Sequence, residues 1–343
     1  MRFRCGAVIF SLVFALASIP AWADIPPQER QVLLNLYAST NGAGWIHHDG
    51  WGGAAGTECT WFGVACGGVN SNAYVGALYL NGNNLVGTLP AINNLTGLTY
   101  FTVAGNTLSG PLPSLSGLTA LVTLHVHNNQ FTGPIPSLAG LTSIRDLYFV
   151  SNQLSGTIPS LDGLDLLEQV EVSNNLLTGS LPSLAGHTAL RDFDATNNQL
   201  TGTIPSLAGL TSLTGFSAES NQLTGSIPKP PASMVAYLLG YNQLSGPLPD
   251  LSGLPALWYL WVEHNQLSGS LPDLSGAPSL ISLQIQNNQL GGVLPNPPSG
   301  LTADSAVVCP NGFEHVDSSA WNAITGVTPW WSGCDDLFAN GFQ

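Results

Sequence analysis

The sequence predicts a solenoid of about ten stacked 23-residue repeats, mostly β, with a parallel sheet on the concave side and an irregular or 3₁₀ convex side. Apolar residues lie five and three positions before a recurring asparagine and two after it, as Leu147, Phe149 and Leu154 do around Asn152. Gly-x-Ile/Leu-Pro begins four positions after the asparagine, as at 156–159. The asparagine returns at this constant interval, apart from one step that is shorter by two positions: Asn83, Asn106, Asn129, Asn152, Asn175, Asn198, Asn221, Asn242, Asn265 and Asn288.

Each repeat is expected to begin with a short strand and a sharp turn. Leu147 and Phe149 alternate with polar or exposed positions, which is the period of a strand with one buried face. The asparagine that follows carries both a donor and an acceptor, so it can bond backbone groups of its own turn and of the adjacent turn. We therefore expect a ladder of ten side-chain amides along the stack.

The segment 1–23 has the marks of a secretory signal peptide: Arg2 and Arg4, an apolar run over 5–19, and an Ala-x-Ala site ending at Ala23. We expect a mature, monomeric chain that starts near Asp24 and is secreted, cell-surface or periplasmic. No later stretch is continuously apolar for the ~20 residues of a membrane span.

Export makes the cysteines candidates for disulfides, and four remain after Ala23. Three pairings are possible in principle. Cys59 with Cys66 and Cys309 with Cys334 is the favoured pairing, because the repeats separate these two pairs by the length of the solenoid.

The composition excludes several functions. The formal net charge is −14, which disfavours nucleic acid and anionic membranes as partners. No Gly-x-Ser-x-Gly, His-Glu-x-x-His, phosphate-loop or dinucleotide motif occurs, so no enzyme, catalytic residue or cofactor is predicted. Glu171 and Asp194 on neighbouring strands are spaced for glycoside chemistry, but a flat sheet lacks a water-excluding pocket.

The repeat LxxLxLxxNxLxGxIPxLxxLxx, over about residues 75–304, resembles the plant-type leucine-rich repeat of receptor ectodomains and polygalacturonase-inhibiting proteins. Residues 59–66 resemble the Cys-x-Trp-x-Gly-Val-x-Cys of that family's N-terminal cap, and 27–39 resemble its amphipathic cap helix. The resemblance implies a cap at 24–74, in which Trp45, Trp51 and Trp61 cover the open end. A C-terminal cap with a short tail is expected at 305–343.

The sequence departs from the plant proteins in ways that favour a bacterial secreted member. The repeat is shorter by one position than the usual repeat of plant receptors, and a single N-glycosylation sequon occurs, at 94–96. The tail at 334–342 is similar to short tails on exported proteins of some gammaproteobacteria.

The outward positions of the concave sheet, six, four and two before each asparagine, are not required by the fold, so their composition is informative. Aromatic residues gather at both ends and carboxylates in the middle. The candidate ligand contacts are Tyr79, Tyr100, His125, His127, Asp146, Tyr148, Glu171, Asp192, Asp194, Glu219, Tyr259, Trp261 and Glu263. Aromatic faces would stack on a ligand, and carboxylates would bind cations or hydroxyls. The plainer interpretation is a solvated acidic face with cross-strand packing.

Metal sites were weighed and are not predicted. His125 and His127, with Asp146 on the next strand, have the ligand types of zinc or copper. Asp192 and Asp194 could contribute to calcium binding. Histidines and carboxylates on a polar face are more common than either site. The exposed-aromatic pair Trp330 and Trp331 is predicted to close the last repeat rather than to bind carbohydrate.

The sequence thus predicts a non-catalytic recognition protein that binds a protein, peptide or glycan through the concave face. Two alternatives stay open. One is ice or surface binding through a repetitive Thr/Ser/Asn ladder on the convex side, and the other is a structural spacer or adhesin module.

Overall fold

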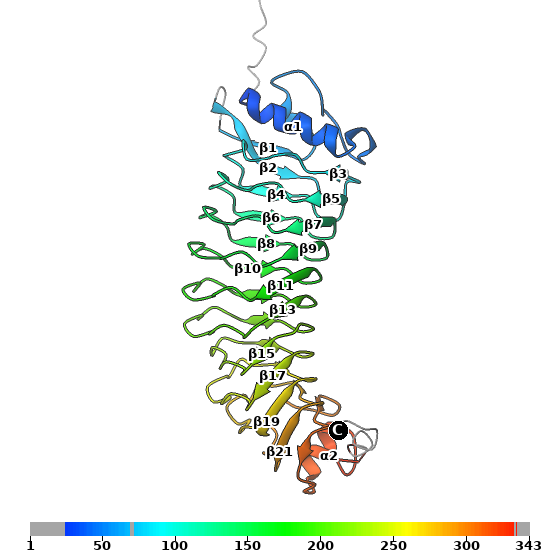
Figure 1. Cartoon of the computed structure of the whole chain (residues 1–343), viewed down its shortest axis with the longest axis vertical. Coiled ribbons are helices and arrows are strands. Elements are labelled where there is room, and N and C mark those ends of the chain that lie inside the picture. The colour runs from blue at the N-terminus through cyan, green and yellow to red at the C-terminus, as the bar shows by residue number, and fades with distance from the viewer. Residues whose placement is uncertain (1–24, 69–71, 333, 335–343) are drawn as a thin grey trace, which may run out of the picture.

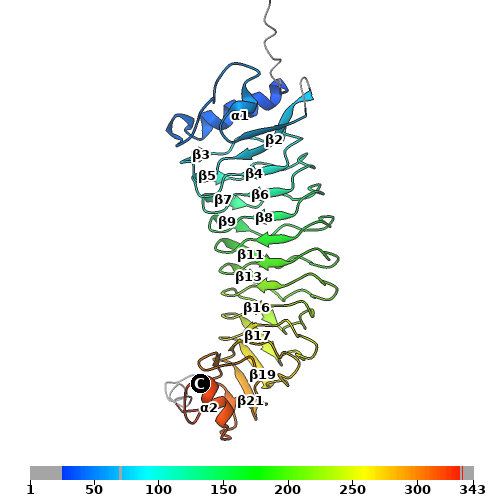
Figure 2. The same cartoon turned by 180° about the vertical axis from the view of Figure 1, so that it is seen from behind.

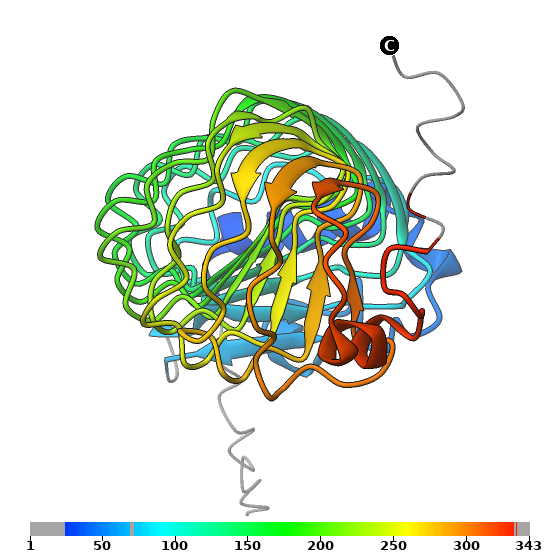
Figure 3. The same ribbon diagram turned by 90° about the horizontal axis from the view of Figure 1, so that it is seen from below.

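The computed structural model describes residues 25–68, 72–332 and 334. The coils form an elongated stack, with helix α1 (Pro27–Ser39) at one end and helix α2 (Ser319–Thr325) at the other (Figure 1, Figure 2). The predicted solenoid is confirmed. Viewed along the long axis, successive coils are rotated, so the stack is twisted (Figure 3). No helix of the described residues is long and apolar enough to cross a membrane. The expected signal peptide and all of the tail after Cys334 lie outside the described residues.

One sheet of twelve strands runs the length of the stack, and its outer surface is the face predicted to be concave. Its first pair is antiparallel and the other pairs are parallel, with each coil in register with the next. The strands, in sheet order, are β1 (Val64–Gly67), β2 (Tyr74–Tyr79), β4 (Tyr100–Thr102), β6 (Thr123–His125), β8 (Asp146–Tyr148), β10 (Gln169–Glu171), β12 (Asp192–Asp194), β14 (Gly215–Ser217), β16 (Ala236–Leu238), β18 (Tyr259–Trp261), β20 (Ser282–Gln284) and β22 (Ala306–Val307).

A second set of strands, which the sequence pattern did not predict, follows the recurring asparagines. Six strands form one sheet: β3 (Val86–Thr88), β5 (Thr107–Pro111), β7 (Gln130–Pro134), β9 (Gln153–Gly156), β11 (Leu176–Ser180) and β13 (Gln199–Thr201). Five form another: β15 (Thr224–Gly225), β17 (Gln243–Gly246), β19 (Gln266–Ser270), β21 (Gln289–Gly292) and β23 (Gly312–Phe313). The two sheets are separated between β13 and β15, next to the coil from Asn221 to Asn242 that is two residues shorter than the others. An isolated bridge joins Thr203 to Thr224 there.

The asparagine side chains bond as predicted from the second repeat onward, whereas that of Asn83 bonds the backbone of His47 in the N-terminal cap. The Nδ2 of Asn152 donates to the carbonyl of Phe149 in its own turn, at 3.0 Å, and to that of Val126 in the preceding coil, at 3.2 Å. Its Oδ1 accepts from the amide of Phe131, also in the preceding coil, at 3.0 Å. Each amide therefore joins adjacent coils and pairs backbone groups that the turn would leave unbonded.

The ladder extends one step further than predicted, to Asn311, which lies one repeat length after Asn288. The Nδ2 of Asn311 donates to the carbonyl of Ile285 at 2.8 Å, and its Oδ1 accepts from the amide of Leu290 at 3.0 Å. The strands β22 and β23 pair with β20 and β21. The repeat register thus continues into the residues that we expected to form only the C-terminal cap.

Aromatic packing closes the N-terminal end. The 3₁₀ turns η1 (Gly42–Gly44) and η2 (Glu58–Thr60) follow α1. Trp45, Trp51 and Trp61 are buried, with ring centroids 4.8 Å apart for the first two and 5.2 Å for the last two. Beneath α1, the buried carboxylate of Glu29 accepts from the amide of Val75 at 2.6 Å.

Both predicted disulfides, Cys59–Cys66 and Cys309–Cys334, are present. The second joins the last coil to the segment after α2. Trp330 is buried there against Phe313, and its Nε1 donates to the carbonyl of Val316 at 3.0 Å. Trp330 therefore closes the stack, as predicted.

Candidate binding face

The middle of the long sheet presents a continuous row of polar side chains. His125 pairs in register with Tyr148, Tyr148 with Glu171, and Glu171 with Asp194. Because side chains alternate across a sheet, the flanking residues Leu147, Val170 and Phe193 are buried and the row faces outward. Adjacent members of the row lie on strands ~4.8 Å apart.

A second row runs beside the first, two residues earlier on each strand. Asp146 pairs with Gln169, and Gln169 with Asp192. Gln169 accepts a hydrogen bond from the hydroxyl of Tyr148, which links the two rows. The carboxylate of Asp192 lies over the next coil, because a Cβ on Gly215 would be 2.2 Å from its Oδ1.

Burial and like charge act together on these carboxyls. Burial raises the pKa of Glu171 to about 7, and the charges of Asp194 and Asp192 contribute. Burial also raises the pKa of Glu219 to about 7, with contributions from the charges of Glu263 and Asp194. Both effects disfavour the ionised form, and a cation bound nearby would favour it.

The described basic side chains are paired elsewhere. Arg30 pairs with Glu58, Arg145 and Arg191 pair with Glu168, and Lys229 pairs with Asp250. Burial raises the pKa of Asp192 and the charge of Arg191 opposes that rise, but the ion pair of Arg191 is with Glu168. Within the described part of the chain, no ion pair involves the carboxylates of the two rows.

His125, His127 and Tyr148 form an aromatic cluster at the N-terminal end of the acidic rows. The ring centroid of Tyr148 lies 4.4 Å from that of His125 and 5.9 Å from that of His127. The Nε2 of His125 and the Nδ1 of His127 are buried and have no hydrogen-bond partner among the described residues. Burial lowers the pKa of both imidazoles.

The histidine and carboxylate side chains of the face do not assemble into a larger group. Among residues 25–68, 72–332 and 334, no three His, Cys, Asp or Glu side chains are placed to hold one metal ion.

The aromatic residues expected at the face lie at its two ends. Tyr79 and Tyr100 are 45% and 41% exposed, and their ring centroids are 6.2 Å apart. Tyr259 and Trp261 lie toward the other end, where the Nε1 of Trp261 donates to Ser282 at 2.9 Å. The thirteen predicted residues thus share one surface, but these two aromatic groups are separated by the acidic rows.

Sequence reasoning missed three contributors, Gly215, Gly240 and Gln286. Asp192 lies over Gly215, and Glu263 lies over Gly240. Gln286 has a buried Oε1 that lacks a partner among the described residues. Glycines at outward positions beside a carboxylate of an adjacent coil were the available signal for Gly215 and Gly240.

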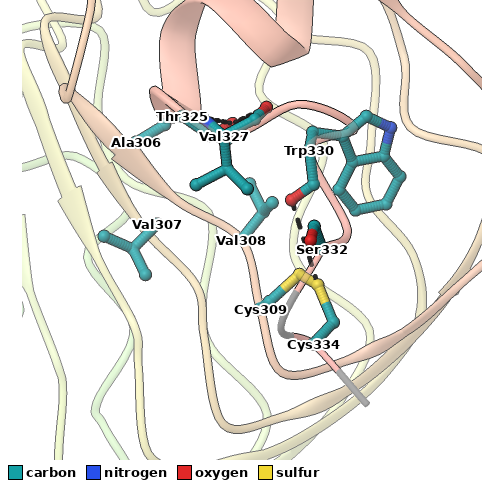
Figure 4. A pocket seen from close by; sticks show the side chains of 9 residues that line it. All are labelled: Ala306, Val307, Val308, Cys309, Thr325, Val327, Trp330, Ser332 and Cys334. Carbon is teal, nitrogen blue, oxygen red and sulfur yellow. Dashed lines mark hydrogen bonds between the residues drawn. A yellow bond between two sulfur atoms is a disulfide. The ribbon is translucent and has the colours of Figure 1, made fainter. Parts of the chain in front are cut away.

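A cavity of about 200 Å³ lies in the C-terminal cap, separate from the acidic rows (Figure 4). It lies beside the Cys309–Cys334 disulfide, with Val308, Trp330 and Ser332 in its wall. Its lining contains no ionisable side chain other than the disulfide-bonded cysteines, so it offers little for a charged ligand.

The family model described as Leucine Rich Repeat matches residues 120–141. The chain has the leucine-rich-repeat fold. A search of curated protein sequences finds no match.

Solved leucine-rich-repeat structures resemble the whole stack. One is the ectodomain of the plant membrane receptor kinase GASSHO1/SCHENGEN3 from Arabidopsis thaliana in complex with CASPARIAN STRIP INTEGRITY FACTOR 2, with 30% identity, a TM-score of 0.70, and coverage of 82% of this chain and 38% of that chain. Another is the plant peptide hormone receptor RGFR1 in complex with RGF2, with 30% identity, a TM-score of 0.57, and coverage of 66% and 42%. The match spans less than half of each receptor structure.

A third similar structure is a plant ice-binding protein, with 26% identity, a TM-score of 0.65, and coverage of 82% of this chain and 93% of that chain. Solved structures similar to this chain therefore include both plant receptors in complex with other molecules and an ice-binding protein.

Proposed function

We propose that this leucine-rich-repeat chain is an exported, non-catalytic recognition protein that binds an extended, positively charged peptide segment across its long sheet. The observation that carries the proposal is the double row containing Glu171, Asp192 and Asp194, which no described basic side chain neutralises. Partly buried carboxylates close to one another favour a cationic ligand, because it pairs with charges that the fold leaves unpaired.

The geometry favours a peptide over a glycan. Sugar hydroxyls can donate hydrogen bonds to the carboxylates but cannot offset their charge. An extended chain rises ~3.3–3.6 Å per residue, so a short peptide can cross several strands that lie ~4.8 Å apart. The similar receptor structures in complex with CASPARIAN STRIP INTEGRITY FACTOR 2 and with RGF2 support a ligand of this class.

The test is a titration of the mature chain, residues 24–343, with an alternating lysine–serine peptide long enough to cross the acidic coils. Its glutamate–serine counterpart and a neutral oligosaccharide serve as comparison ligands. The lysine peptide should bind and the other two should not. The variant Glu171→Gln/Asp194→Asn should bind at least about tenfold more weakly, which corresponds to ~1.4 kcal/mol.

The matched control for this variant is Glu314→Gln/Asp273→Asn, which removes the same two charges at exposed positions away from the acidic rows. Equal losses in both double variants would mean that net charge, and not this face, determines binding. Absence of binding by the lysine peptide would reject the proposal.

Ice or surface binding is the second candidate, favoured by the similar plant ice-binding protein and by the second set of strands. We assign the Thr/Ser ladder of this function to these strands. Its threonines include Thr132, Thr178, Thr201 and Thr224, all exposed. Thermal hysteresis that is lost in Thr178→Lys/Thr201→Lys, and kept in Glu171→Gln/Asp194→Asn, would support this function. No hysteresis would exclude it.

A further inference from the structure

Glu219, Gly240 and Glu263 occupy one position on three consecutive coils, two residues after the ends of β14, β16 and β18. Backbone hydrogen bonds hold these coils side by side. The amide of Ser220 donates to the carbonyl of Gly240 at 3.0 Å, and the amide of Tyr241 donates to that of Glu263 at 2.9 Å. The glycine therefore lies between two glutamates on the outer surface of the sheet.

The side chain of Glu263 occupies the space over the glycine. A Cβ on Gly240 would lie 2.6 Å from the Oε1 and 3.0 Å from the Oε2 of Glu263. Because Gly240 has no side chain, the carboxylate of Glu263 can lie against the backbone on the side toward Glu219. Glu263 is only 6% exposed, which is unusual for a carboxylate at an outward position.

Two acceptor oxygens at this place lack donors. The Oε2 of Glu263 and, on the next coil, the Oε1 of Gln286 are buried and have no hydrogen-bond partner among the described residues. A buried acceptor without a donor is costly and uncommon in folded proteins. The surface between Glu219 and Gln286 is therefore short of a donor and of positive charge.

We propose that Glu219, Glu263 and Gln286 form a subsite for a primary ammonium group, which binds beside the Glu263 carboxylate that covers Gly240. In the peptide ligand proposed above, this group is a lysine side chain. An ammonium group has three donors in a compact shape, enough for two carboxylates and one amide oxygen. A guanidinium is planar and broader, and it pairs best side by side with one carboxylate.

A divalent cation fits these residues less well. Calcium takes six to eight oxygen ligands and magnesium prefers an octahedral set. The two glutamates supply the only carboxylates of the subsite, and the described residues contain no group of three acidic, histidine or cysteine side chains around one point.

Trp261 provides an apolar wall for the methylenes of such a side chain. It is the last residue of β18 and lies two residues before Glu263, so the alternation of the extended chain puts both side chains on the same face. Its Nε1 donates to Ser282, and its ring packs edge-on against that of Tyr259, with centroids 6.2 Å apart at an interplanar angle of 86°. Lysine stems pack on apolar surfaces of this kind while the charged end reaches polar groups.

The test uses n-butylammonium chloride as the probe, followed by the indole N–H resonance of Trp261, which the Trp261→Phe variant identifies. The proposal predicts a saturable shift with a dissociation constant on the order of 10 mM. n-Butylguanidinium should bind at least about threefold more weakly, and sodium chloride at equal ionic strength should give no saturable shift.

Two variants of the subsite and one control variant make the test specific. Glu263→Gln should abolish saturation, whereas Glu314→Gln, the same charge change at an exposed site beside the second set of strands, should not alter it. Gly240→Ala keeps every charge but places a methyl group where the Glu263 carboxylate lies. Its backbone has no positive φ to exclude alanine. It should weaken binding at least about fivefold while the protein stays folded.

A linear, non-saturating response to n-butylammonium in the wild type would overturn the subsite, as would unchanged binding in both Glu263→Gln and Gly240→Ala. The assignment of the ammonium group to a lysine of a peptide rests on the proposed function. The binding of an ammonium group at this place does not. Saturable n-butylammonium binding without binding of the lysine–serine peptide would support the subsite and reject the peptide function. Peptide binding with no saturable n-butylammonium response would reject the subsite and support the peptide function.

Discussion

The carboxylate of Glu263 lies against the backbone of Gly240, and its Oε2 is buried without a hydrogen-bond partner among the described residues. Burial raises the pKa of this carboxyl, since the ionised form has lost water without gaining a cation. The buried, unpaired carboxylate of Glu263 therefore lowers the free energy of unfolding. Such a cost is expected of a binding site whose ligand completes the pairing.

Glu263→Gln should therefore stabilise the unliganded protein at pH 8 by about 1 kcal/mol, because it removes an unpaired buried charge and keeps the shape. Urea unfolding followed by circular dichroism measures the free energy of unfolding. The control Glu314→Gln should change it by less than about 0.5 kcal/mol. A destabilised Glu263→Gln protein would mean that the carboxylate has a structural partner.

The stability of the wild type should fall as the pH rises from 4.5 to 8, through the contribution of Glu171 and Glu219. Their folded-state pKa values of about 7 lie above the ordinary value of 4.5, so their contribution is fully present below 4.5 and is lost as the pH passes 7. After discounting for solvent screening, each carboxyl should account for about 1–2 kcal/mol.

The variant Glu171→Gln/Glu219→Gln should lose this part of the pH dependence. Unfolding free energies for both proteins at pH 4.5, 6 and 8 provide the comparison. If the unfolding free energies of the two proteins changed in parallel with pH, the two carboxyls would titrate alike in the folded and unfolded states.

Asn129→Leu should lower the free energy of unfolding by about 2 kcal/mol or more, because backbone groups lose their partners. The Nδ2 of Asn129 donates to the carbonyl of Val103 at 3.0 Å, and its Oδ1 accepts from the amide of Leu108 at 3.0 Å. The adjacent Asn128 has a φ of 55°, which suits glycine. Asn128→Gly should therefore be nearly neutral, and equal effects of the two changes would contradict the ladder.

The imidazole of His125 should titrate below its ordinary pKa of 6.5, because burial and the neighbouring His127 lower the value. Asp146 raises it through its charge, so Asp146→Asn should lower the pKa of His125 further. Protonation of His125 therefore favours the unfolded state, and its contribution to stability is fully present above pH 6.5 and is lost as the pH falls through the lower folded-state pKa. An NMR titration of the ring signals measures this, and a higher pKa in Asp146→Asn would refute the assignment.

The structure of one coil was predictable from the sequence because the same residue pattern recurs in each repeat. The spacing around Asn152 specifies a buried strand, a turn and an amide that bonds the neighbouring coil, and each appears as expected. The strands of the second set escaped prediction because segments such as 153–156 are short and end in glycine. The eleventh ladder position, Asn311, was available from the repeat spacing, but residues 295–304 before it lack the Pro-Ser-Leu-x-Gly-Leu-Thr-x-Leu pattern of other repeats.

The candidate site was only partly predictable. Period alone places Glu171 and Asp194 side by side on one face. The burial of Glu263 depends on a glycine in the preceding coil and on the direction that its own side chain takes. No local pattern specifies that direction, so the sequence placed Glu263 on the acidic surface but did not predict its burial.

The most direct test of the peptide-binding proposal is calorimetric titration of residues 24–343 with the lysine–serine peptide at about 50 and about 200 mM sodium chloride. Saturable binding that weakens with salt, and that Glu171→Gln/Asp194→Asn loses while Glu314→Gln/Asp273→Asn keeps, is the predicted result. No binding at either salt concentration, or equal binding by both double variants, would contradict the proposal.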